Sequence, residues 1–403
     1  MNTSIGAPVA GGMQAVLALA ATQLSAQQLK AIEPFAREHF RQLDADDLAE
    51  RSPQDLLGAL LSHWQFGASR EPGKPKVRVF SPGAEDGWSS RHSVVQIIND
   101  DMPFLVDSTT MEINRQGLTL HLIVHPIYAV ERDPAGVARS ILPRKQAPDA
   151  PRESWIYIEI DRLPDPQQRA AVVAGIERAL ADVRAAVEDW PAMGAQLQAA
   201  IAQLEHAPAA LPATQVAESR AFLTWMAQDH FTLLGYRQHD LVLENGQDAL
   251  RLVPGSGLGL LRENAQEKLS ASFSALPAQA RLLAHAPLPV LVVTKANTRS
   301  TVHRAGYTDY IGVKRYSERG EVIGEQRFIG LFTSTAYSAR VAETPLLRGK
   351  VGCVSAGASG RHGNGGLPTA WRIDLGVANR RLRFDTRLRI NDALRRCFGE
   401  QHG

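Results

Sequence analysis

The stretch 93–188 constrains the fold most, because its apolar residues repeat first at strand spacing and then at helix spacing, twice in succession. The strand-like "SVVQIIN" (93–99) runs into a helix-like stretch that ends near Gly117, and a long apolar strand follows. "ESWIYIEI" (153–160) then alternates its side chains, so that one aliphatic face is buried. A helix with apolar residues three and four apart completes the pattern after Pro166. The stretch therefore predicts a mixed α/β unit.

Helices precede this unit. Residues 12–67 have helical spacing, and Ser52 can cap a helix whose first position is Pro53, with Asp55 closing the capping box. A linker follows at 70–76, because Pro, Gly and charged residues break the apolar pattern there. We therefore expect a helical segment that ends before the α/β unit begins.

A second folded unit follows the first. The Ala- and Pro-rich "EHAPAALPAT" (205–214) has no periodicity and is the best boundary between the two. Beyond it, β-branched and aromatic residues dominate 307–334, and Gly320 marks a turn in the middle of that stretch. The sequence therefore predicts a mostly antiparallel sheet after residue 214, and an α+β fold class for the chain.

The charge balance gives no sign of an overall nucleic-acid surface but sets the C-terminal end apart. The chain has a formal net charge of +2, whereas residues 351–403 hold nine Arg, no Lys and four acidic residues. Both cysteines, Cys353 and Cys397, lie in the same end. The first 350 residues can therefore form neither a disulfide nor a cysteine-based zinc site, which fits a reducing, cytoplasmic setting.

An apolar stretch near the start resembles a signal peptide at first sight. However, "MQAVLALAATQLSA" (13–26) has no Lys or Arg before Lys30, so it lacks the charged start that signal peptides have. An Ala-rich amphipathic helix explains it better. No apolar run reaches the ~20 residues that span a bilayer.

Two adjacent carboxylates, Asp100 and Asp101, follow Asn99 where a strand gives way to a helix near Pro103. Carboxylates there can cap free N–H groups and interact favourably with the helix dipole, which predicts a structural cap. The same N–H groups bind anions, so a small-ligand site at this turn is an alternative. A catalytic acid/base pair needs two carboxylates aimed into one cleft, whereas adjacent side chains point apart. The structural cap is therefore favoured over the other two interpretations.

The remaining motifs give no catalytic or cofactor signature. "GSGLGLLR" (255–262) has Leu260 where a dinucleotide fingerprint needs a third glycine, so a turn between strands is favoured. His121 and His125 are four residues apart on a strand and share one face, but a third metal ligand is not visible. We expect neither a metal site nor a bound cofactor in this chain.

A basic cluster lies in "TKANTRSTVHR" (294–304), where cationic side chains stand among hydroxyl groups. It is most simply a solvated basic loop, and the alternative is a contact for an anion or for a carboxylate of another domain. The candidate residues are Lys295, Arg299, His303 and Arg304.

Several long stretches carry a resemblance to a known family: "VVQIINDDMPFLVDSTTMEINRQGLTLHLIVHPIYAVERD", "ESWIYIEIDRL", "FLTWMAQDHFTLLGYRQHDL", "VPGSGLGLLR" and "LVVTKANTRSTVHRAGYTDYIGVKRYSERGEVIGEQRFIGLFTSTAYS". In this order they resemble the N-terminal region of the large bacterial NAD-specific glutamate dehydrogenases. The resemblance extends from about residue 30 to about residue 350. In that family the region consists of ACT-like and PAS-like domains with helical motifs, which are associated with regulation and assembly.

The turn "NDDMPFLVDS" resembles the strand-to-helix turn of an ACT module, whose pattern is a strand, Asp-x-Pro-Gly and a helix. Asp101 and Pro103 fit this pattern, but Phe104 stands where the glycine lets an amino acid approach the backbone. Phe104 therefore favours packing or an interface over effector binding. The effector-binding candidates that the resemblance implies are Asn99, Asp100, Asp101 and Asp107.

The resemblance also divides the chain into domains. A simple βαββαβ order needs a last strand after the helix at 166–188, and "KVRVFSP" from the N-terminal side is expected to supply it. The expected parts are an N-terminal helical segment (1–72), an ACT-like α/β sandwich with trailing helices (73–204), a linker (205–214), a PAS-like antiparallel sheet domain (215–350) and an irregular, poorly ordered tail (351–403).

The resemblance implies a role in regulation and assembly rather than catalysis for this chain. The family oxidatively deaminates L-glutamate to 2-oxoglutarate and ammonium with NAD, in a catalytic domain that lies downstream. We therefore expect the chain alone to be inactive and to bind no NAD. Its expected partners are the catalytic domain, further copies of the chain and an amino-acid effector, without nucleic acid or membrane. The alternatives are a free-standing ACT/PAS amino-acid sensor and an oligomerisation module.

The resemblance stops near "TPLLRGKV", where the sequence becomes rich in Arg and Gly and lacks Lys. One interpretation is a reading-frame shift or a truncated gene. The alternative is a genuine basic tail that binds nucleic acid. Sequencing the locus downstream of codon 350 in all frames distinguishes the two, because an intact frame through the tail contradicts the first.

Overall fold

The computed structural model describes residues 7–262, 269–270, 273 and 284–348. The chain divides into two compact units, Met1–Val187 with Ser300–Gly306 and Glu188–Arg299 with Tyr307–Gly403. Within the described ranges, no helix has the length and apolar composition that a membrane span requires. The predicted tail at 351–403 lies outside the described residues.

A six-stranded antiparallel sheet forms the centre of the first unit, in the order β1-β2-β6-β4-β5. β6 is central because it pairs with β2 along one edge and with β3 and β4 along the other. The strands are β1 (Lys76–Phe80), β2 (Ser93–Asp100), β3 (Leu120–Val124), β4 (Ile127–Arg132), β5 (Ala138–Pro143) and β6 (Arg152–Ile160).

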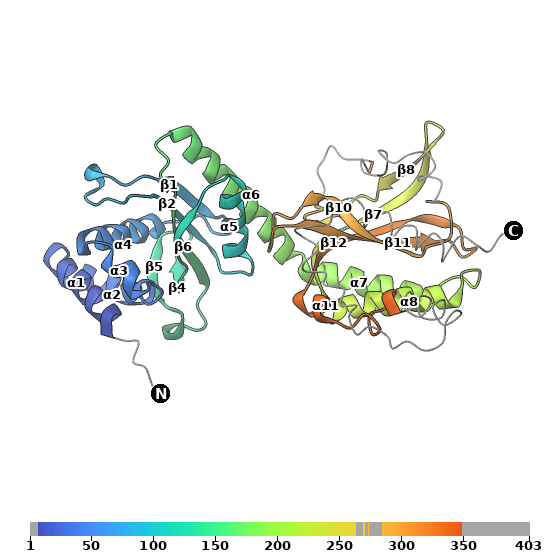
Figure 1. Ribbon diagram of the computed structural model, residues 1–403, viewed down its shortest axis with the longest axis horizontal. Helices are drawn as coiled ribbons and strands as arrows, with labels where there is room; N and C mark the ends of the chain where they lie inside the picture. Colours follow the sequence, from blue (N-terminus) through green and yellow to red (C-terminus); the bar gives the residue numbers. More distant parts are fainter. Residues whose placement is uncertain (1–6, 263–268, 271–272, 274–283, 349–403) are drawn as a thin grey trace, which may run out of the picture. The chain divides into compact units, whose positions relative to one another are not determined.

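Helices cover both faces of this sheet (Figure 1). The N-terminal helices pack on one face, while α5 and α6 lie on the other. The helices are α1 (Ala7–Gln23), α2 (Ala26–Phe40), α3 (Ala45–Ala49), α4 (Pro53–Gly67), α5 (Leu105–Arg115) and α6 (Pro166–Glu188), with the short turns η1 (Ala84–Asp86) and η2 (Arg144–Gln146).

The start of α4 has the predicted Ser52 cap and Pro53, but Asp55 does not close the predicted capping box, because its carboxylate binds the Ser52 hydroxyl and not the Ser52 backbone N–H. The Ser52 side chain accepts a hydrogen bond from the Asp55 backbone N–H at 3.1 Å, and Pro53 occupies the first helical position. The Asp55 carboxylate accepts hydrogen bonds from the Ser52 hydroxyl and from the Ser89 backbone N–H. The cap therefore also fastens the helix to the segment that precedes β2.

Strand β6 is buried on both faces, not only on its aliphatic face. Ile156 and Ile158 are fully buried on one face, as predicted, and Trp155 and Tyr157 are buried on the other. The reason is the N-terminal helical layer, which covers the face that the sequence pattern alone would leave open to solvent.

Strand β1, which contains most of "KVRVFSP", pairs with β2 at the sheet edge and supplies the strand that the βαββαβ order lacked. The long strand predicted after Gly117 is wrong in one respect. It divides into β3 and β4 around His125 and Pro126, since proline has no N–H for the ladder. Strand β5 had no counterpart in the prediction.

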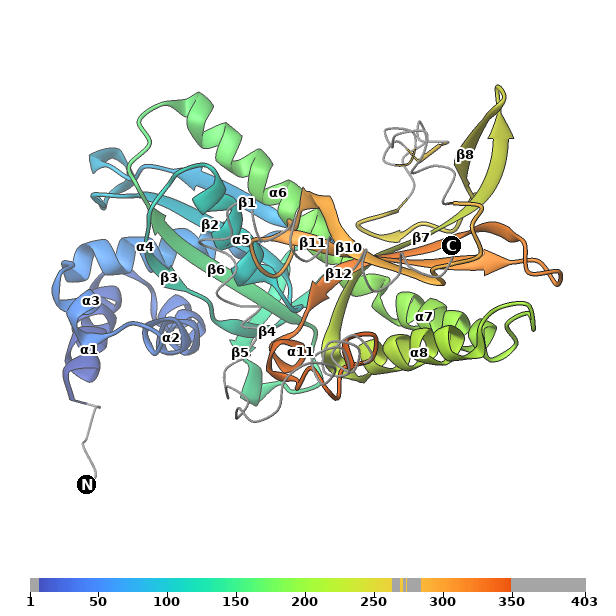
Figure 2. The same cartoon turned by 45° about the vertical axis from the view of Figure 1, so that its right-hand side comes forward.

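A second six-stranded antiparallel sheet forms the second unit, in the order β10-β11-β12-β7-β8, with β9 paired to β7. Helices α7 and α8 lie together against one face, where they form a core with Tyr236 and Phe328 (Figure 2). The elements are α7 (Trp190–Glu205), α8 (Ala213–Trp225), η3 (Met226–His230), β7 (Phe231–Glu244), β8 (Gln247–Leu252), β9 (Leu258–Gly259), β10 (Leu291–Arg299), β11 (Tyr307–Tyr316), β12 (Val322–Phe332) and α11 (Ser334–Ser338).

The hairpin predicted for 307–334 is confirmed. β11 and β12 pair in antiparallel register, and Gly320 adopts a φ of 84° in the turn between them. A positive φ suits glycine because it has no Cβ to clash with the backbone. The stretch 255–262 also forms a turn with the short strand β9, in place of a phosphate-binding loop.

The units divide at residues 187 and 188, earlier than the linker expected at 205–214. Helix α7 buries Met193, Leu197 and Leu204 in the core of the second unit. Residues 206–212 only connect α7 to α8. The apolar spacing of α6 continues into α7 in the sequence. For this reason the prediction wrongly assigned α7 to the domain of the first sheet.

Candidate functional site

Asp100 lies between two arginines at the end of β2. Its Oδ1 accepts a hydrogen bond from Arg70 Nη2 at 2.5 Å, and its Oδ2 accepts one from Arg184 Nη2 at 2.7 Å. Arg70 follows α4 in the chain, and Arg184 lies on α6. Partial burial raises the pKa of the Asp100 carboxyl, but the hydrogen bonds from Arg184 and Arg70 outweigh this and lower the pKa below its ordinary value. Asp100 is therefore a charged acceptor at neutral pH and not a proton donor.

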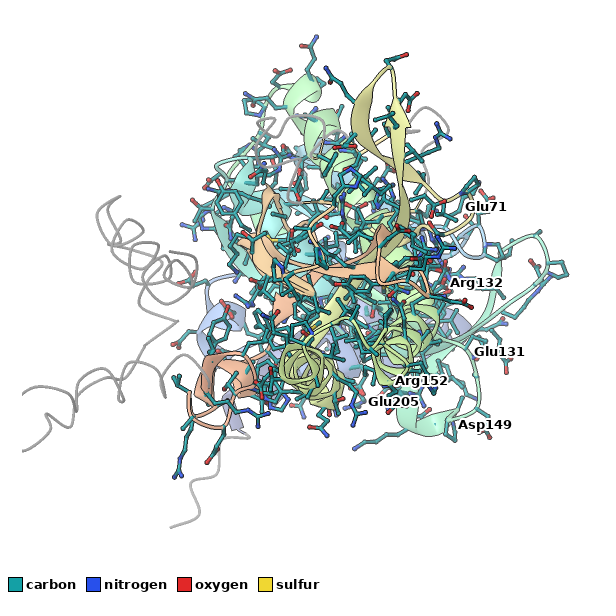
Figure 3. The ribbon with its side chains drawn as sticks, turned by 90° about the vertical axis from the view of Figure 1, so that its right-hand side faces the viewer. Glu71, Glu131, Arg132, Asp149, Arg152 and Glu205 are labelled. Carbon is teal, nitrogen blue, oxygen red and sulfur yellow. The ribbon has the colours of Figure 1, made fainter. Side chains whose placement is uncertain are left out.

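Glu153 is the buried carboxylate of the same cluster. It is 2% exposed, and its Oε1 accepts hydrogen bonds from Arg70 Nη2 at 2.8 Å and Arg132 Nε at 2.7 Å. Its Oε2 accepts from Arg132 Nη2 at 2.8 Å and from Trp155 Nε1 at 3.2 Å. Arg132 comes from β4 and is labelled in Figure 3. We call Arg70, Arg132, Arg184, Asp100 and Glu153 the arginine–carboxylate network.

The two adjacent aspartates do not share a site. Asp101 Oδ1 accepts a hydrogen bond from Ser154 Oγ at 2.7 Å, away from the arginines that hold Asp100. Asn99 is buried, and its side chain donates to the Asp100 carbonyl and accepts from Arg184. The geometry therefore offers no shared proton between two carboxylates, which a catalytic acid/base pair requires.

The predicted helix cap is wrong. Phe104 occupies the N-cap position of α5, and no side chain caps that helix. The prediction failed because the helix begins later than expected. α5 starts at Leu105, so Asp100 and Asp101 lie before the first turn and bind side chains of the sheet layer and of α6 instead.

Phe104 adopts a left-handed backbone conformation with a φ of 71°, which is the conformation that the glycine of the ACT pattern provides at no steric cost. Its ring lies 4.9 Å from the ring of His303, centroid to centroid. His303 also has a left-handed φ, of 73°, and its backbone N–H donates to Ser108 Oγ at 3.2 Å. His303 Nδ1 lies 3.8 Å from Asp107 Oδ2. Phe104 thus serves packing, as its bulk predicted.

The four residues of the predicted basic cluster belong to two different units. Lys295 pairs with Asp309 at 2.6 Å, and the Arg299 guanidinium lies over the Tyr307 ring, both within the second unit. His303 and Arg304 belong to Ser300–Gly306, which is part of the first unit. The cluster is continuous in sequence but divided in the fold, because β10 ends at Arg299 where it pairs with Tyr307.

His121 and His125 bind different partners. His121 Nε2 contacts Asp161 Oδ1 at 2.8 Å and its ring stacks on His92, whereas the His125 backbone N–H donates to Gln42. Among the residues that the structure describes, no group of three His, Cys, Asp or Glu side chains is placed to hold a metal ion.

Sequence reasoning found only Asp100 of the network and missed Glu153 and the three arginines. Arg70 stands in the stretch identified as a linker, and neither Arg132 nor Arg184 belongs to a motif. One signal was available. Glu153 alternates with Trp155 and Tyr157 on a strand, and a carboxylate at a buried position requires a cationic partner.

Comparison with known proteins connects the first unit to one family. Residues 35–176 match the family model described as glutamate dehydrogenase, ACT1 domain. This range contains α4, α5, about half of α6 and the whole first sheet, together with the arginine–carboxylate network apart from Arg184.

The similar curated proteins are described as NAD-specific glutamate dehydrogenases. The chain is 36% identical over 351 residues to the NAD-specific glutamate dehydrogenase of Halomonas elongata, covering 85% of this chain and 22% of the relative. It is 35% identical over 334 residues to that of Pseudomonas aeruginosa, covering 82% and 20%, and 27% identical over 316 residues to that of Mycobacterium tuberculosis, covering 76% and 18%. The chain thus spans about a fifth of the length of these curated relatives.

Among solved structures, an RNA-binding light-oxygen-voltage receptor aligns with 78% of this chain and 89% of its own. The TM-score is 0.18 and the sequence identity 12%. These values are too low for a structural argument.

Proposed function

The chain contains the ACT1 domain of the glutamate dehydrogenase family, and on this basis we propose that it acts as a regulatory and assembly region of an NAD-specific glutamate dehydrogenase. The parent reaction is the oxidative deamination of L-glutamate to 2-oxoglutarate and ammonium with NAD. The observation that carries the proposal is 36% identity over 351 residues to an enzyme of that description, together with the domain match.

The described side chains support a role other than catalysis. The charged groups of the arginine–carboxylate network bind one another, and the lowered pKa of Asp100 keeps that carboxyl ionised. We propose that NAD binds in another part of the parent enzyme, and that this chain alone does not turn over glutamate.

The proposed partners follow from the same role. They are the catalytic domain of the parent enzyme, further copies of this chain in a homo-oligomer, and an amino-acid effector, in the cytoplasm and without nucleic acid or membrane. The candidate effector residues Asn99, Asp100, Asp101 and Asp107 remain a proposal. Their side chains already bind partners, except that Asp107 is largely exposed and only approaches His303.

The test combines an assay and a reconstitution. The purified 403-residue chain should form no NADH above background from glutamate and NAD. The chain should also associate with a Halomonas elongata enzyme from which the matching segment has been deleted, measured by light scattering after size-exclusion chromatography. Turnover by the chain alone, or no association at micromolar concentrations, contradicts the proposal.

A second candidate is a free-standing sensor that binds an amino acid. A cavity in the first unit favours it, because charged side chains of both signs line that cavity. The sensor binds ligand without the catalytic domain, whereas an oligomerisation module assembles without any ligand. Calorimetry and light scattering on the isolated chain separate the two.

A further inference from the structure

A groove of about 250 Å³ lies in the first unit beside β5, the strand at one end of the sheet. Residues 138–142 of β5 all line it, together with residues of α2 and of the C-terminal end of α4. Successive side chains of a strand point to opposite faces, so a groove that touches all five residues runs along the edge of the strand. No residue of the arginine–carboxylate network lines this groove.

The outer edge of β5 already pairs with a short segment of the chain itself. The Ala138 backbone N–H donates to the Ala68 carbonyl at 2.9 Å, and Ser69 lies opposite Val137 in antiparallel register. From Arg139 onwards, no strand in the described part of the chain pairs with this edge. A strand edge without a neighbour presents N–H and C=O groups to which an extended chain can bind. The edge of β5 can therefore accept a further strand.

Helix α2 contributes a backbone acceptor to the groove. Pro34 lies inside α2 and has no N–H, so the Lys30 carbonyl lacks the donor that the residue four positions later normally provides. Lys30, Ala31 and Pro34 all line the groove, and Trp64 of α4 and Ile141 of β5 add apolar surface to it. Backbone hydrogen-bonding groups beside apolar side chains are what an extended peptide requires, because they bind its main chain and its alternate side chains.

The rim of the groove is basic. Lys30 and Arg139 are exposed, and none of the described residues that line the groove is acidic. Arg139 binds Asp133 through Nη2, but its guanidinium has further N–H donors and its side chain is 69% exposed. Arg144 and Lys145 follow directly after β5 and are exposed as well. Positive charge along the edge repels basic strands and attracts carboxylates, which selects for an acidic partner.

We propose that this groove binds an extended acidic peptide segment of a partner polypeptide, which adds to the first sheet as a strand beside β5. The main chain of the segment continues the antiparallel pairing at the start of β5. Its apolar side chains lie against Trp64 and Ile141, and its carboxylates bind Lys30 and Arg139. A phosphate ion pairs with the cations alone, whereas a peptide also binds the N–H and C=O groups of the edge. The surroundings therefore favour the peptide.

This inference goes beyond the proposed function, because it assigns a class of partner to one surface of the first unit. It does not depend on the catalytic domain, since all the residues involved belong to that unit. If the chain binds an acidic peptide but does not associate with the truncated enzyme, only the proposed function fails. Association with the truncated enzyme without peptide binding contradicts only this inference.

The first test uses matched peptides on the full chain. A fluorescent peptide of alternating glutamate and valine, blocked at both ends, should bind saturably with one site per chain in anisotropy titrations. The same peptide with lysine in place of glutamate should bind at least ~10-fold more weakly, because it brings like charges to the basic rim. No saturable binding of the acidic peptide, equal affinity for the lysine peptide, or displacement by inorganic phosphate at constant ionic strength overturns the proposal.

Two further measurements test strand addition and the identity of the occupant. Methylation of the backbone nitrogens either of all valines or of all glutamates removes the N–H donors of one edge of the peptide. At least one of the two methylated peptides should therefore bind at least ~10-fold more weakly, and full affinity of both overturns strand addition. Light scattering should show that the peptide leaves the oligomeric state of the chain unchanged. A dimer that the peptide dissociates would identify a second copy as the occupant and overturn the proposal.

Substitutions then place the bound peptide in this groove. Ala31 is exposed and lines the groove from α2, so Ala31→Trp should fill it and weaken binding of the acidic peptide at least ~10-fold by steric exclusion. Lys30→Gln leaves the core intact because Lys30 is exposed, and it should weaken binding several-fold. Arg37→Gln is the matched control, since Arg37 is an exposed cation on the same helix that does not line the groove. Undiminished binding in both Ala31→Trp and Lys30→Gln contradicts the proposal.

Discussion

Two glutamates on strand β6 have the same chemistry in different surroundings. Glu153 and Glu159 are both buried on the face of the sheet that the N-terminal helices cover, and each binds an arginine and an aromatic side chain. Glu153 binds a second arginine as well, whereas Glu159 binds one arginine and lines a cavity that Glu153 does not line. A buried carboxylate that is fully surrounded by donors holds a fold together. One with fewer donors beside open space is suited to exchange a partner for a ligand.

The largest effect should come from Glu153→Gln. The Arg70 and Arg132 side chains are only 4% and 7% exposed, so water cannot replace the carboxylate: Arg132 would lose Glu153 as its charge partner, and Arg70 would keep only Asp100. Removing one partner of a buried ion pair costs about 3–5 kcal/mol in unfolding free energy. Hydrogen exchange of the β6 amides in the full chain measures this loss. The control is Glu71→Gln, because Glu71 is exposed (Figure 3) and its replacement should change stability by less than ~0.5 kcal/mol. Equal effects of the two substitutions would show that the network does not stabilise the sheet.

The next largest effect should come from His39, which makes the stability of the first unit depend on pH. Burial lowers the pKa of His39 to about 4, and His63 and Tyr157 lie close to its ring. The unfolded state, with a pKa near 6.5, therefore binds the proton first as pH falls. The contribution of neutral His39 to the free energy of unfolding is fully present above about pH 6.5. It decreases by on the order of 3 kcal/mol as the pH falls to about 4.

His39→Phe isolates this contribution, because phenylalanine does not titrate. Urea unfolding of both proteins at pH 7 and pH 4 should show a smaller loss of stability in the variant, by roughly 2–3 kcal/mol. An identical pH dependence in the two proteins would mean that His39 is solvated or protonated in the folded state.

Glu159→Gln should cost less than Glu153→Gln, and this is the most direct test of the comparison. The Arg51 side chain is 20% exposed, and its Nη1 also donates to the Asp47 carbonyl, so water and that carbonyl compensate part of the loss. We expect about 1–2 kcal/mol, in the range for an unsatisfied partner that retains some solvent. Hydrogen exchange of β6 measures both variants in the same experiment. A loss as large as that of Glu153→Gln would remove the distinction between the two sites.

Most of the fold was predictable from periodicity, since Ile156, Ile158 and the hairpin at Gly320 follow from local spacing. The second buried face of β6 was not, because it depends on helices that lie more than 80 residues earlier in the sequence. The ring of Phe35 in α2, for example, lies 5.2 Å from the ring of Trp155, centroid to centroid. The alternation of residues predicts which side chains of a strand share a face, but it does not predict whether one or both faces are covered by other elements.

Of the candidate site, only Asp100 was predicted from the sequence. "NDDMP" drew attention to Asp100, but Arg70 and Arg184 are 30 and 84 residues from it and stand in unremarkable sequence. Phe104 was recognised as the departure from the ACT pattern. Its left-handed backbone conformation could not be predicted from the residue type, because phenylalanine rarely has a positive φ.

Replacement of Phe104 tests whether that conformation stores strain. Phe104→Gly and Phe104→Ala both remove the ring contact with His303, but only alanine keeps a Cβ at a φ of 71°. The glycine variant should therefore be more stable than the alanine variant by about 1 kcal/mol, the cost of the left-handed region for a residue with a side chain. Thermal unfolding of the pair measures the difference. Greater stability of the alanine variant would indicate that the turn relaxes when the ring is removed.

The smallest effect should come from Asp107→Asn. Asp107 is 62% exposed and its Oδ2 lies 3.8 Å from His303 Nδ1, so solvent screens the interaction. Exposed pairs of this kind contribute about 0–1 kcal/mol, and we expect a change below ~0.5 kcal/mol at neutral pH. Because the ring of His303 packs on Phe104 and its backbone binds Ser108, the segment around it keeps two anchors without the carboxylate. Hydrogen exchange of the His303 amide checks this directly. Loss of its protection in Asp107→Asn would show that charge, and not packing, holds the segment against the turn.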